Sequence, residues 1–420
     1  MTNNWSKFGD RFARPTGASE LMEDLGLAAA LKNDVLLLGG GNPGIIPAMQ
    51  TLFRDRLVEI AASQSNSTEM FGNYSHPKGD IEFRKALASL LKREYGWSLS
   101  PDNILLTSGS QTGFFLLFNL LAGEFSDGEF KRILLPVTPE YIGYADVGLH
   151  DNMFVSQQPE IEEQADGFFK YRVNFETLEI TEDIAALCIS RPTNPTGNVI
   201  TDKELQKLDE LAKQAGIPLI IDNAYGLPFP QIIFSGASPF WNNNVIMTMS
   251  LSKLGLPGMR TGIIIAKEEI IEALSNITAV QSLAVSTVGP VLVQPWLENG
   301  EIIDISRRYI TSFYEKKSRY ASEILKAGLE GLSFRIHVPE GAFFLWLWLP
   351  GLPITSHELY ERLKARGVLV MSGHHFFPGL DEPWRHRDEC LRLSYSQSDD
   401  VISAGIHILC QEIRALYMHK

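Results

Sequence analysis

The spacing of hydrophobic and polar residues over the first two thirds of the chain predicts helices and strands in alternation. Apolar residues recur at helical spacing in four stretches, 46–62, 79–96, 111–123 and 201–216. Short apolar runs that predict buried strands lie at 35–38, 103–107, 132–137, 185–190, 217–222, 244–250 and 261–266. Runs this rich in isoleucine, valine and leucine are typical of mostly parallel strands, so we expect an α/β fold.

The pattern changes in the last third of the chain. A long helical stretch at about 302–327 is followed by four more apolar runs, at 333–339, 343–349, 367–371 and 391–395. We expect these runs to be strands interleaved with helices, which indicates a second, smaller α+β domain. A chain of 420 residues is long for one domain, so two are expected. The acidic stretch 160–166 is expected to be a solvated loop.

Glycines 39, 41 and 44 follow the first predicted strand with the spacing G-x-G-x-x-G. A dinucleotide site would need a second strand that ends in an acidic residue about twenty residues farther on. The helix that follows ends instead in a polar stretch, "SQSNSTE", without a strand. The pattern therefore disfavours a dinucleotide site, and the glycines serve either a tight turn or a close approach of the backbone to a ligand.

Composition and charge narrow the classes of function. The net charge of -13 and the lack of a basic stripe argue against a nucleic-acid surface, so small molecules are the expected partners. The longest apolar run, "FFLWLWLPGLP", is too short to span a bilayer, and the first residues lack the apolar core of a signal peptide. Three widely separated cysteines fit neither a disulfide framework nor a metal cluster. We expect a cytoplasmic protein without a metal site.

Polar residues stand just after several of the predicted strands. Ligands of open parallel sheets bind at this edge, beyond the carboxyl ends of the strands. The residues expected to converge there are Asn194, Asp222, Tyr225, Ser250, Lys253 and Arg260. The stretch "SGSQTG" at 108–113 adds the start of a helix, whose free N–H groups bind phosphate.

These residue types together favour a pyridoxal phosphate site. An amine at a buried sheet rim, here Lys253, loses part of its preference for the charged form and becomes a nucleophile. A carboxylate such as Asp222 can pair with the pyridine nitrogen and make the ring an electron sink. Taken singly, Lys253 could be an exposed loop lysine and Asp222 a cap at a strand end.

Other functions remain as alternatives. Ser250 to Lys253 also spells S-x-x-K, the motif of serine acylases, but the S-D-N and K-T-G motifs of that family are missing. A binding module on the same fold would usually lack the lysine or carry a DNA-binding segment. A pyridoxal phosphate lyase differs only in how the substrate is oriented, so the residues leave that alternative open.

Ordered motifs along nearly the whole chain resemble the fold-type I pyridoxal phosphate aminotransferases. The motifs are "GGGNP", "YSHPKGDIEFRKAL", "SGSQ", "TPEY", "RPTNPTGNVIT", "DNAYG", "SLSKLGLPGMRTG", "PEGAFFLWL" and "LRLSY". The resemblance implies a large domain with a mostly parallel seven-stranded sheet between helices, and a smaller α+β domain. It also implies a division into an N-terminal segment at 1–46, which packs with the small domain and a partner subunit, the cofactor domain at 47–301 and the small domain at 302–420.

The resemblance also assigns roles to matching positions. Lys253 would bind the cofactor aldehyde and move the proton, with Asp222 and Tyr225 as the other catalytic residues. Residues implied to bind the cofactor are Ser110, Gln111, Tyr141, Asn194, Asp222, Tyr225, Ser250, Ser252, Lys253, Arg260 and, from the other subunit of a homodimer, Tyr74. Residues implied to bind the substrate are Gly41, Asn194 and Arg392, whose guanidinium would bind the carboxylate.

The implied reaction is transfer of an amino group by ping-pong chemistry. The implied donors are aliphatic L-amino acids, valine or alanine, and the acceptors are 2-oxo acids, pyruvate or 3-methyl-2-oxobutanoate. The loop from Lys253 to Arg260 is one residue shorter than in many relatives, and Ser372 stands where proline is usual. His374 and His375 receive no catalytic role, because two adjacent histidines without further ligands are not a metal site.

Overall fold

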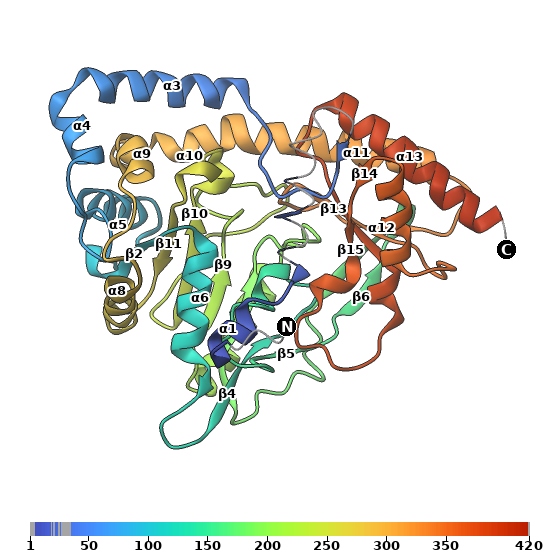
Figure 1. Cartoon of the computed structure of the whole chain (residues 1–420), viewed down its shortest axis with the longest axis horizontal. Helices are drawn as coiled ribbons and strands as arrows, with labels where there is room; N and C mark the ends of the chain where they lie inside the picture. The colour runs from blue at the N-terminus through green and yellow to red at the C-terminus, as the bar shows by residue number, and fades with distance from the viewer. Residues whose placement is uncertain (1–4, 18, 20–21, 24–25, 27–34, 419–420) are drawn as a thin grey trace.

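The computed structural model describes residues 5–17, 19, 22–23, 26 and 35–418. It contains two main sheets, each with helices packed beside it (Figure 1). A core of buried side chains runs through both parts. The α/β fold predicted from the apolar spacing is confirmed.

The larger sheet has eight strands in the order β2-β11-β10-β9-β8-β4-β3, with β5 paired to β4. The strands are β2 Ile104–Thr107, β3 Gly123–Glu124, β4 Phe130–Leu135, β5 Phe154–Ser156, β8 Ile184–Ser190, β9 Leu219–Asp222, β10 Val245–Ser250 and β11 Gly262–Ile265. All run parallel except β11 and β3. The prediction of seven strands is therefore wrong by one. The two residues of β3 are too few to produce an apolar pattern.

The helices around this sheet confirm the periodic stretches. They are α3 Pro47–Ala62, α4 Gln64–Phe71, α5 Ile81–Tyr95, α6 Ser110–Leu121, α7 Asp202–Gln214, α8 Glu268–Ser282 and α9 Val288–Glu298. Thr201 caps α7 as predicted, in a capping box with Glu204. The polar stretch after α3 forms a helix, α4, and no strand follows it before α5, so the structure agrees with the exclusion of a dinucleotide unit.

The second sheet has six strands in the order β15-β16-β13-β12-β7-β6. They are β6 Glu160–Glu163, β7 Phe168–Arg172, β12 Arg335–His337, β13 Phe344–Trp348, β15 Met371–Ser372 and β16 Cys390–Ser394. The prediction of a loop at 160–166 is wrong, because β6 pairs with β7 and its acidic side chains bind Arg172 and Arg335. This sheet thus takes strands from both sides of the boundary expected at residue 301.

The remaining helices lie in the C-terminal third of the chain. They are α10 Glu301–Ile305, the π-helix η6 Ser306–Thr311, α11 Ser312–Leu329, α12 Ser356–Ala365 and α13 Asp399–Met418. The long helix predicted at 302–327 is therefore continuous but contains a π segment. Short 3-10 turns are η1 Pro101–Asn103, η2 Ile142–Tyr144, η3 Ala165–Gly167, η4 Ser252–Leu254, η5 Pro257–Met259, η7 Gly373–Phe376 and η8 Arg385–Glu389.

The N-terminal segment lies against both parts of the molecule. Helix α1 Lys7–Phe12 packs Phe12 on Phe115 of α6. Strand β1 Leu36–Leu37 pairs in parallel with β14 Val368–Leu369 beside the second sheet. The chain then passes through the glycines at 39–44 into α3. No helix in the described part of the chain is long and apolar enough to cross a membrane.

Candidate active site

Lys253 lies in the turn η4 directly after β10, at the carboxyl edge of the larger sheet. Its Nζ atom donates a hydrogen bond of 2.8 Å to the carbonyl oxygen of Gly41 and lies 5.2 Å from the ring centres of Tyr225 and Phe343. Burial lowers the pKa of Lys253 to about 8, and the positive charges of Arg392 and Arg260 act in the same direction. The amine therefore becomes a free nucleophile at a much lower pH than an exposed lysine would.

Asp222 is the last residue of β9, beside the strand that leads to Lys253. Its carboxylate accepts hydrogen bonds from Tyr144 Oη at 2.8 Å, from the backbone N–H of Ala224 at 2.9 Å and from Thr248 Oγ1 at 3.4 Å. Burial raises the pKa of Asp222, and these donors oppose the shift because they stabilise the carboxylate. Asp222 also interacts electrostatically with Lys253.

Gly109 and Arg260 lie together at the start of α6. Gly109 begins helix α6 with a φ of 89°, and no side chain caps the N–H groups of that helix end. A Cβ atom on Gly109 would lie only 2.0 Å from Nη2 of Arg260, so the guanidinium rests against the start of the helix. Free N–H groups beside a guanidinium are the donors that bind a phosphate group. Arg260, at the end of the loop after Lys253, therefore lies at this helix end.

The other residues predicted for the phosphate surround the same helix end. Ser110 Oγ donates to the carbonyl oxygen of Met249 at 3.0 Å, and Ser250 Oγ accepts the N–H of Ser252 at 3.0 Å. Gln111 turns its amide to the carbonyl oxygen of Gly143 at 2.9 Å. Gln111 therefore ties α6 to the turn that follows Tyr141.

Arg392 on β16 is fully buried and held from two sides. It donates to Asn194 Oδ1 at 2.7 Å and to the carbonyl oxygen of Gly39 at 2.6 Å. Its guanidinium carbon lies 4.3 Å from the ring centre of Phe344, and Nε has no hydrogen-bond partner among the described residues. Burial lowers the pKa of Arg392 to about 10. A buried cation with an unused donor is suited to bind a carboxylate ligand.

The tyrosines and glycines predicted for the site differ in burial and in the space around them. Tyr141 and Tyr225 are mostly buried near Arg392 and Asp222, whose charges act on the hydroxyl groups of both. Gly41 faces open space, since a Cβ there would meet nothing within 4 Å. Gly39 and Gly44 instead touch the backbone of residues 370 and 396, so close packing requires them. Tyr74 is 87% exposed and does not enter the site of its own chain.

The sequence did not reveal the side chains behind Asp222. Tyr144 Oη lies 3.2 Å from Ser190 Oγ, and Ser190 in turn is hydrogen-bonded to the carboxyl group of Glu140 through both Oγ and its backbone N–H. Tyr144 follows Tyr141 by three residues in the turn η2. In the sequence, only this spacing could have indicated that Tyr144 lies near the site. Glu140 and Ser190 come together through the pairing of strands that are distant in the sequence, which no local pattern shows.

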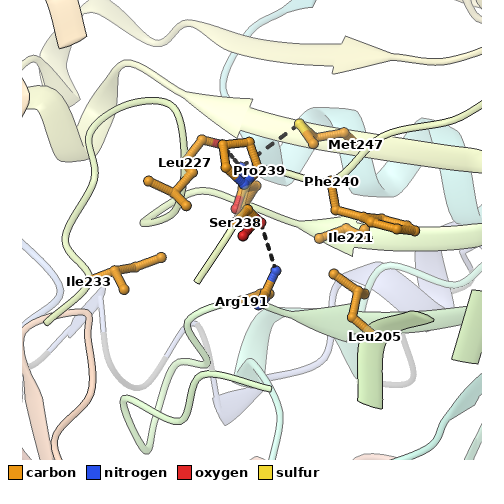
Figure 2. Close-up of a pocket in the computed structure, with 10 residues that line it drawn as sticks. Arg191, Leu205, Ile221, Leu227, Ile233, Ser238, Pro239, Phe240 and Met247 are labelled. Atoms are coloured by element: carbon orange, nitrogen blue, oxygen red, sulfur yellow. Dashed lines mark hydrogen bonds between the residues drawn. The ribbon is translucent and has the colours of Figure 1, made fainter. Parts of the chain in front are cut away.

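A small cavity next to β9 lies outside this group of residues. Figure 2 shows that Arg191 reaches across it to the carbonyl oxygen of Ser238, at 3.1 Å. Arg191 also donates to the carbonyl oxygen of Ile200 at 2.8 Å, so it fixes both ends of the loop that carries Asn194. None of the predicted site residues lines this cavity.

The geometry fits pyridoxal phosphate. Pyridoxal phosphate needs an amine for its aldehyde, a carboxylate for its ring nitrogen and donors for its phosphate. Lys253, Asp222 and the Gly109–Arg260 cradle supply these groups, and the charges of Asp222 and Arg260 both act on the buried amine of Lys253. Among the described residues no cluster of metal ligands is present.

Comparisons with known proteins agree with this site. The sequence pattern of the family "Aminotransferase class I and II" matches residues 46–409. The valine–pyruvate aminotransferase of Escherichia coli K12 is 50% identical over 97% of this chain and 98% of its own length. The crystal structure of valine-pyruvate aminotransferase from Salmonella typhimurium LT2 superposes with a TM-score of 0.89 at 48% identity, covering 96% of this chain and 100% of that one. A crystal structure from Psychrobacter arcticum 273-4 superposes with a TM-score of 0.96 at 46% identity, covering 99% and 100%.

Proposed function

The chain belongs to the class I and II aminotransferases, and we propose that it exchanges an amino group between valine or alanine and pyruvate or 3-methyl-2-oxobutanoate. It is a transaminase that uses pyridoxal 5′-phosphate. The observation that carries the proposed substrates is the 50% identity, over nearly the full length of both chains, to a valine–pyruvate aminotransferase. A ping-pong exchange follows from the chemistry, since one site serves both substrates in turn.

The catalytic roles rest on the positions of Lys253 and Asp222. Bound pyridoxal phosphate would withdraw electrons from the Cα atom of the amino acid. Lys253 Nζ is a neutral amine near its lowered pKa of about 8, so it can take a proton from one atom and return it to another. The carboxylate of Asp222 would hold the proton of the ring nitrogen. The Gly41 carbonyl oxygen, 2.8 Å from Nζ, keeps the free amine oriented.

Substrate binding is assigned to Arg392 and Asn194. The guanidinium has its plane fixed by Asn194 and by the carbonyl oxygen of Gly39, and it stacks on Phe344. A fixed guanidinium can bind both oxygens of a carboxylate, which orients the amino acid. Gly41 leaves open space beside that position. Tyr225 and Asn194 would also contact the ring hydroxyl, and Tyr141 would cover the ring.

The cofactor phosphate is assigned to the cradle at the start of α6. Arg260 and the free N–H groups after Gly109 would provide most of the donors, together with Ser110, Ser250 and Ser252. Gln111 would contribute through its backbone, because its side-chain amide binds Gly143.

A homodimer is proposed, with Tyr74 reaching the site of the partner. Tyr74 and the nearby Phe71 are 87% and 73% exposed, and Val280 and Leu283 at the end of α8 are 90% and 66% exposed; we propose that these side chains belong to one apolar patch. The hydrogen bond from Ser75 Oγ to the carbonyl oxygen of Val285, at 3.1 Å, joins the two segments of this patch. Apolar patches of this kind mark protein interfaces. We also propose a cytoplasmic location, consistent with three free, buried cysteines.

The decisive experiment follows the colour of the purified holoenzyme. Excess L-valine without any oxo acid should abolish the yellow absorbance and release one 3-methyl-2-oxobutanoate per site, and pyruvate should restore the colour and yield alanine. Release of ammonia would indicate a lyase instead. If the yellow absorbance did not change with valine or alanine but was lost with another amino acid, the aminotransfer reaction would stand and the proposed substrates would be refuted.

A further inference from the structure

Glu140 is a fully buried carboxyl group that the proposed reaction leaves without a role. It precedes Tyr141, and its backbone N–H donates to the carbonyl oxygen of Phe376 at 2.8 Å. Its Oε1 atom accepts the N–H of Ser190 at 2.7 Å, and its Oε2 atom is hydrogen-bonded to Ser190 Oγ and accepts the N–H of Tyr141 at 3.4 Å. No cation contacts its carboxyl group in the described part of the chain. A buried carboxylate without a counter-ion is costly, and protonation removes the cost.

The hydroxyl groups between Glu140 and Asp222 have only one proton each. Tyr144 Oη is 2.8 Å from the carboxylate of Asp222, which as an ionised acceptor takes the tyrosine proton. The 3.2 Å contact between Tyr144 and Ser190 then needs the proton of Ser190. If Ser190 donates to Tyr144, the remaining contact between Ser190 Oγ and Glu140 Oε2 requires a proton on Glu140; an ionised Glu140 would instead accept the Ser190 proton and leave the longer contact to Tyr144 unbonded.

We propose that Glu140 is a positioning residue that acts on Asp222 through this chain: protonated Glu140 donates to Ser190, Ser190 donates to Tyr144, and Tyr144 donates to Asp222. The inference rests on the proposed function, in which Asp222 binds the ring nitrogen of the cofactor. Three donors aligned in one direction strengthen one another and stabilise the negative charge on Asp222. The two carboxyl groups thus share a single negative charge.

Loss of the Glu140 proton reverses this arrangement. Ser190 would turn its hydroxyl to the Glu140 carboxylate, Tyr144 would lose a donor, and a second negative charge would face Asp222. The titratable groups that face Glu140 are Asp222 from β9, Cys188 from β8 and Tyr144 from the turn η2. Burial raises the pKa of Glu140 to about 8, so we expect the reversal near that pH.

Infrared spectroscopy of the holoenzyme tests the proton directly. The wild-type protein should show the carbonyl stretch of a protonated carboxyl group that disappears as the pH rises through about 8. The band should be missing in E140Q, whose amide donates to Ser190 Oγ and cannot ionise. E389Q, at a buried glutamate outside the chain of hydrogen bonds, should keep the band. The proposal would be overturned if the wild-type protein showed no such band, or if the band persisted in E140Q.

The variant Y144F tests the row of hydrogen bonds between Glu140 and Asp222 rather than the Glu140 carboxyl group itself. Tyr144 makes no hydrogen bond with Glu140 among the described residues, yet its loss would free the Ser190 hydroxyl to donate to the Glu140 carboxylate. The band of Glu140 should therefore disappear at a lower pH in Y144F than in the wild type. If the Glu140 band titrated at the same pH in Y144F as in the wild type, the proposed hydrogen-bond coupling would be refuted, even if E140Q failed to fold.

The absorbance of the bound cofactor tests whether the hydrogen bonds from Glu140 through Ser190 and Tyr144 act on Asp222. We expect a pH-dependent change in the wild type, following the Glu140 band, that E140Q lacks. A change that persists in E140Q belongs to another group, Lys253 included, and would refute the coupling. Wild-type turnover of valine and pyruvate tests the proposed function separately, so failure of one conclusion does not conceal failure of the other.

Discussion

Lys253 Nζ donates a 2.8 Å hydrogen bond to the carbonyl oxygen of Gly41, which joins the site lysine to the glycine segment before α3. The contact places the glycine segment at the predicted site and not at a dinucleotide site. Gly41 leaves space for a ligand, while Gly39 and Gly44 let the segment pack closely on residues 370 and 396. The segment thus forms one wall of the site.

The lowered pKa of Lys253 predicts the pH at which the amine becomes reactive. In the protein without cofactor, the rate of reaction with an aldehyde should be half-maximal at about pH 8, because below that pH the amine is protonated. The ordinary value of 10.5 would indicate an exposed lysine. D222N provides the control. Asp222 raises the pKa of Lys253, so its neutralisation should move the midpoint to lower pH.

Replacement of Lys253 by alanine should remove the covalent link and the proton carrier together. We expect a loss of turnover of at least about a thousandfold, in the range found for removal of a general acid–base group. Borohydride reduction followed by mass spectrometry should show the cofactor attached to the wild-type chain and not to K253A. An unchanged rate in K253A, with an unchanged melting temperature, would refute the assigned mechanism.

Arg392→Lys should weaken amino-acid binding while the cofactor is retained. Lysine keeps the charge but cannot hold Asn194, the Gly39 carbonyl oxygen and a substrate carboxylate at once. Loss of one charge-assisted hydrogen bond costs about 2 kcal/mol, or about thirtyfold in kcat/KM. Steady-state kinetics with valine and an absorbance spectrum give both readouts. A lost cofactor band would show that Arg392 acts on cofactor binding instead.

Gly109→Ala should weaken cofactor binding more than protein stability. The added Cβ would lie 2.0 Å from Arg260 Nη2 and displace the guanidinium from the phosphate cradle. Gly128→Ala is a matched control, because Gly128 has a similar φ of 87° but open space around its Cβ position. Both variants carry about 1–3 kcal/mol of backbone strain. Titration with pyridoxal phosphate should show a larger dissociation constant only in G109A.

The convergence of Asp222 and Lys253 at one edge of the sheet could be predicted from the sequence because both residues lie at or just after strand ends. Asp222 ends β9 and Lys253 follows β10, and both strands have apolar runs that locate their ends. Phosphate donors at the start of α6 were predictable for the same reason. Each of these predictions depends on local sequence and on one general property of parallel sheets.

Contacts between distant segments could not be predicted. Strand β6 is rich in glutamate, and only its pairing with β7 and its arginine partners makes it a strand. Glu140 and Ser190 are ordinary polar residues in the sequence. They meet because Glu140 lies beyond β4, next to β8 in the sheet, and their significance depends on a shared neighbour, Tyr144.

The last prediction concerns Tyr74 and the proposed dimer. If Tyr74 completes the site of the partner, Y74A and K253A should each be impaired, and a mixture of the two refolded together should regain activity. In a hybrid dimer, one site has Lys253 from one chain and Tyr74 from the other, so random mixing restores about a quarter of the native sites. V280S is the control, since it alters the exposed patch and leaves both site residues intact. Sedimentation should show weaker association in V280S. A mixture without recovered activity, in a protein that sediments as a dimer, would place Tyr74 outside the site.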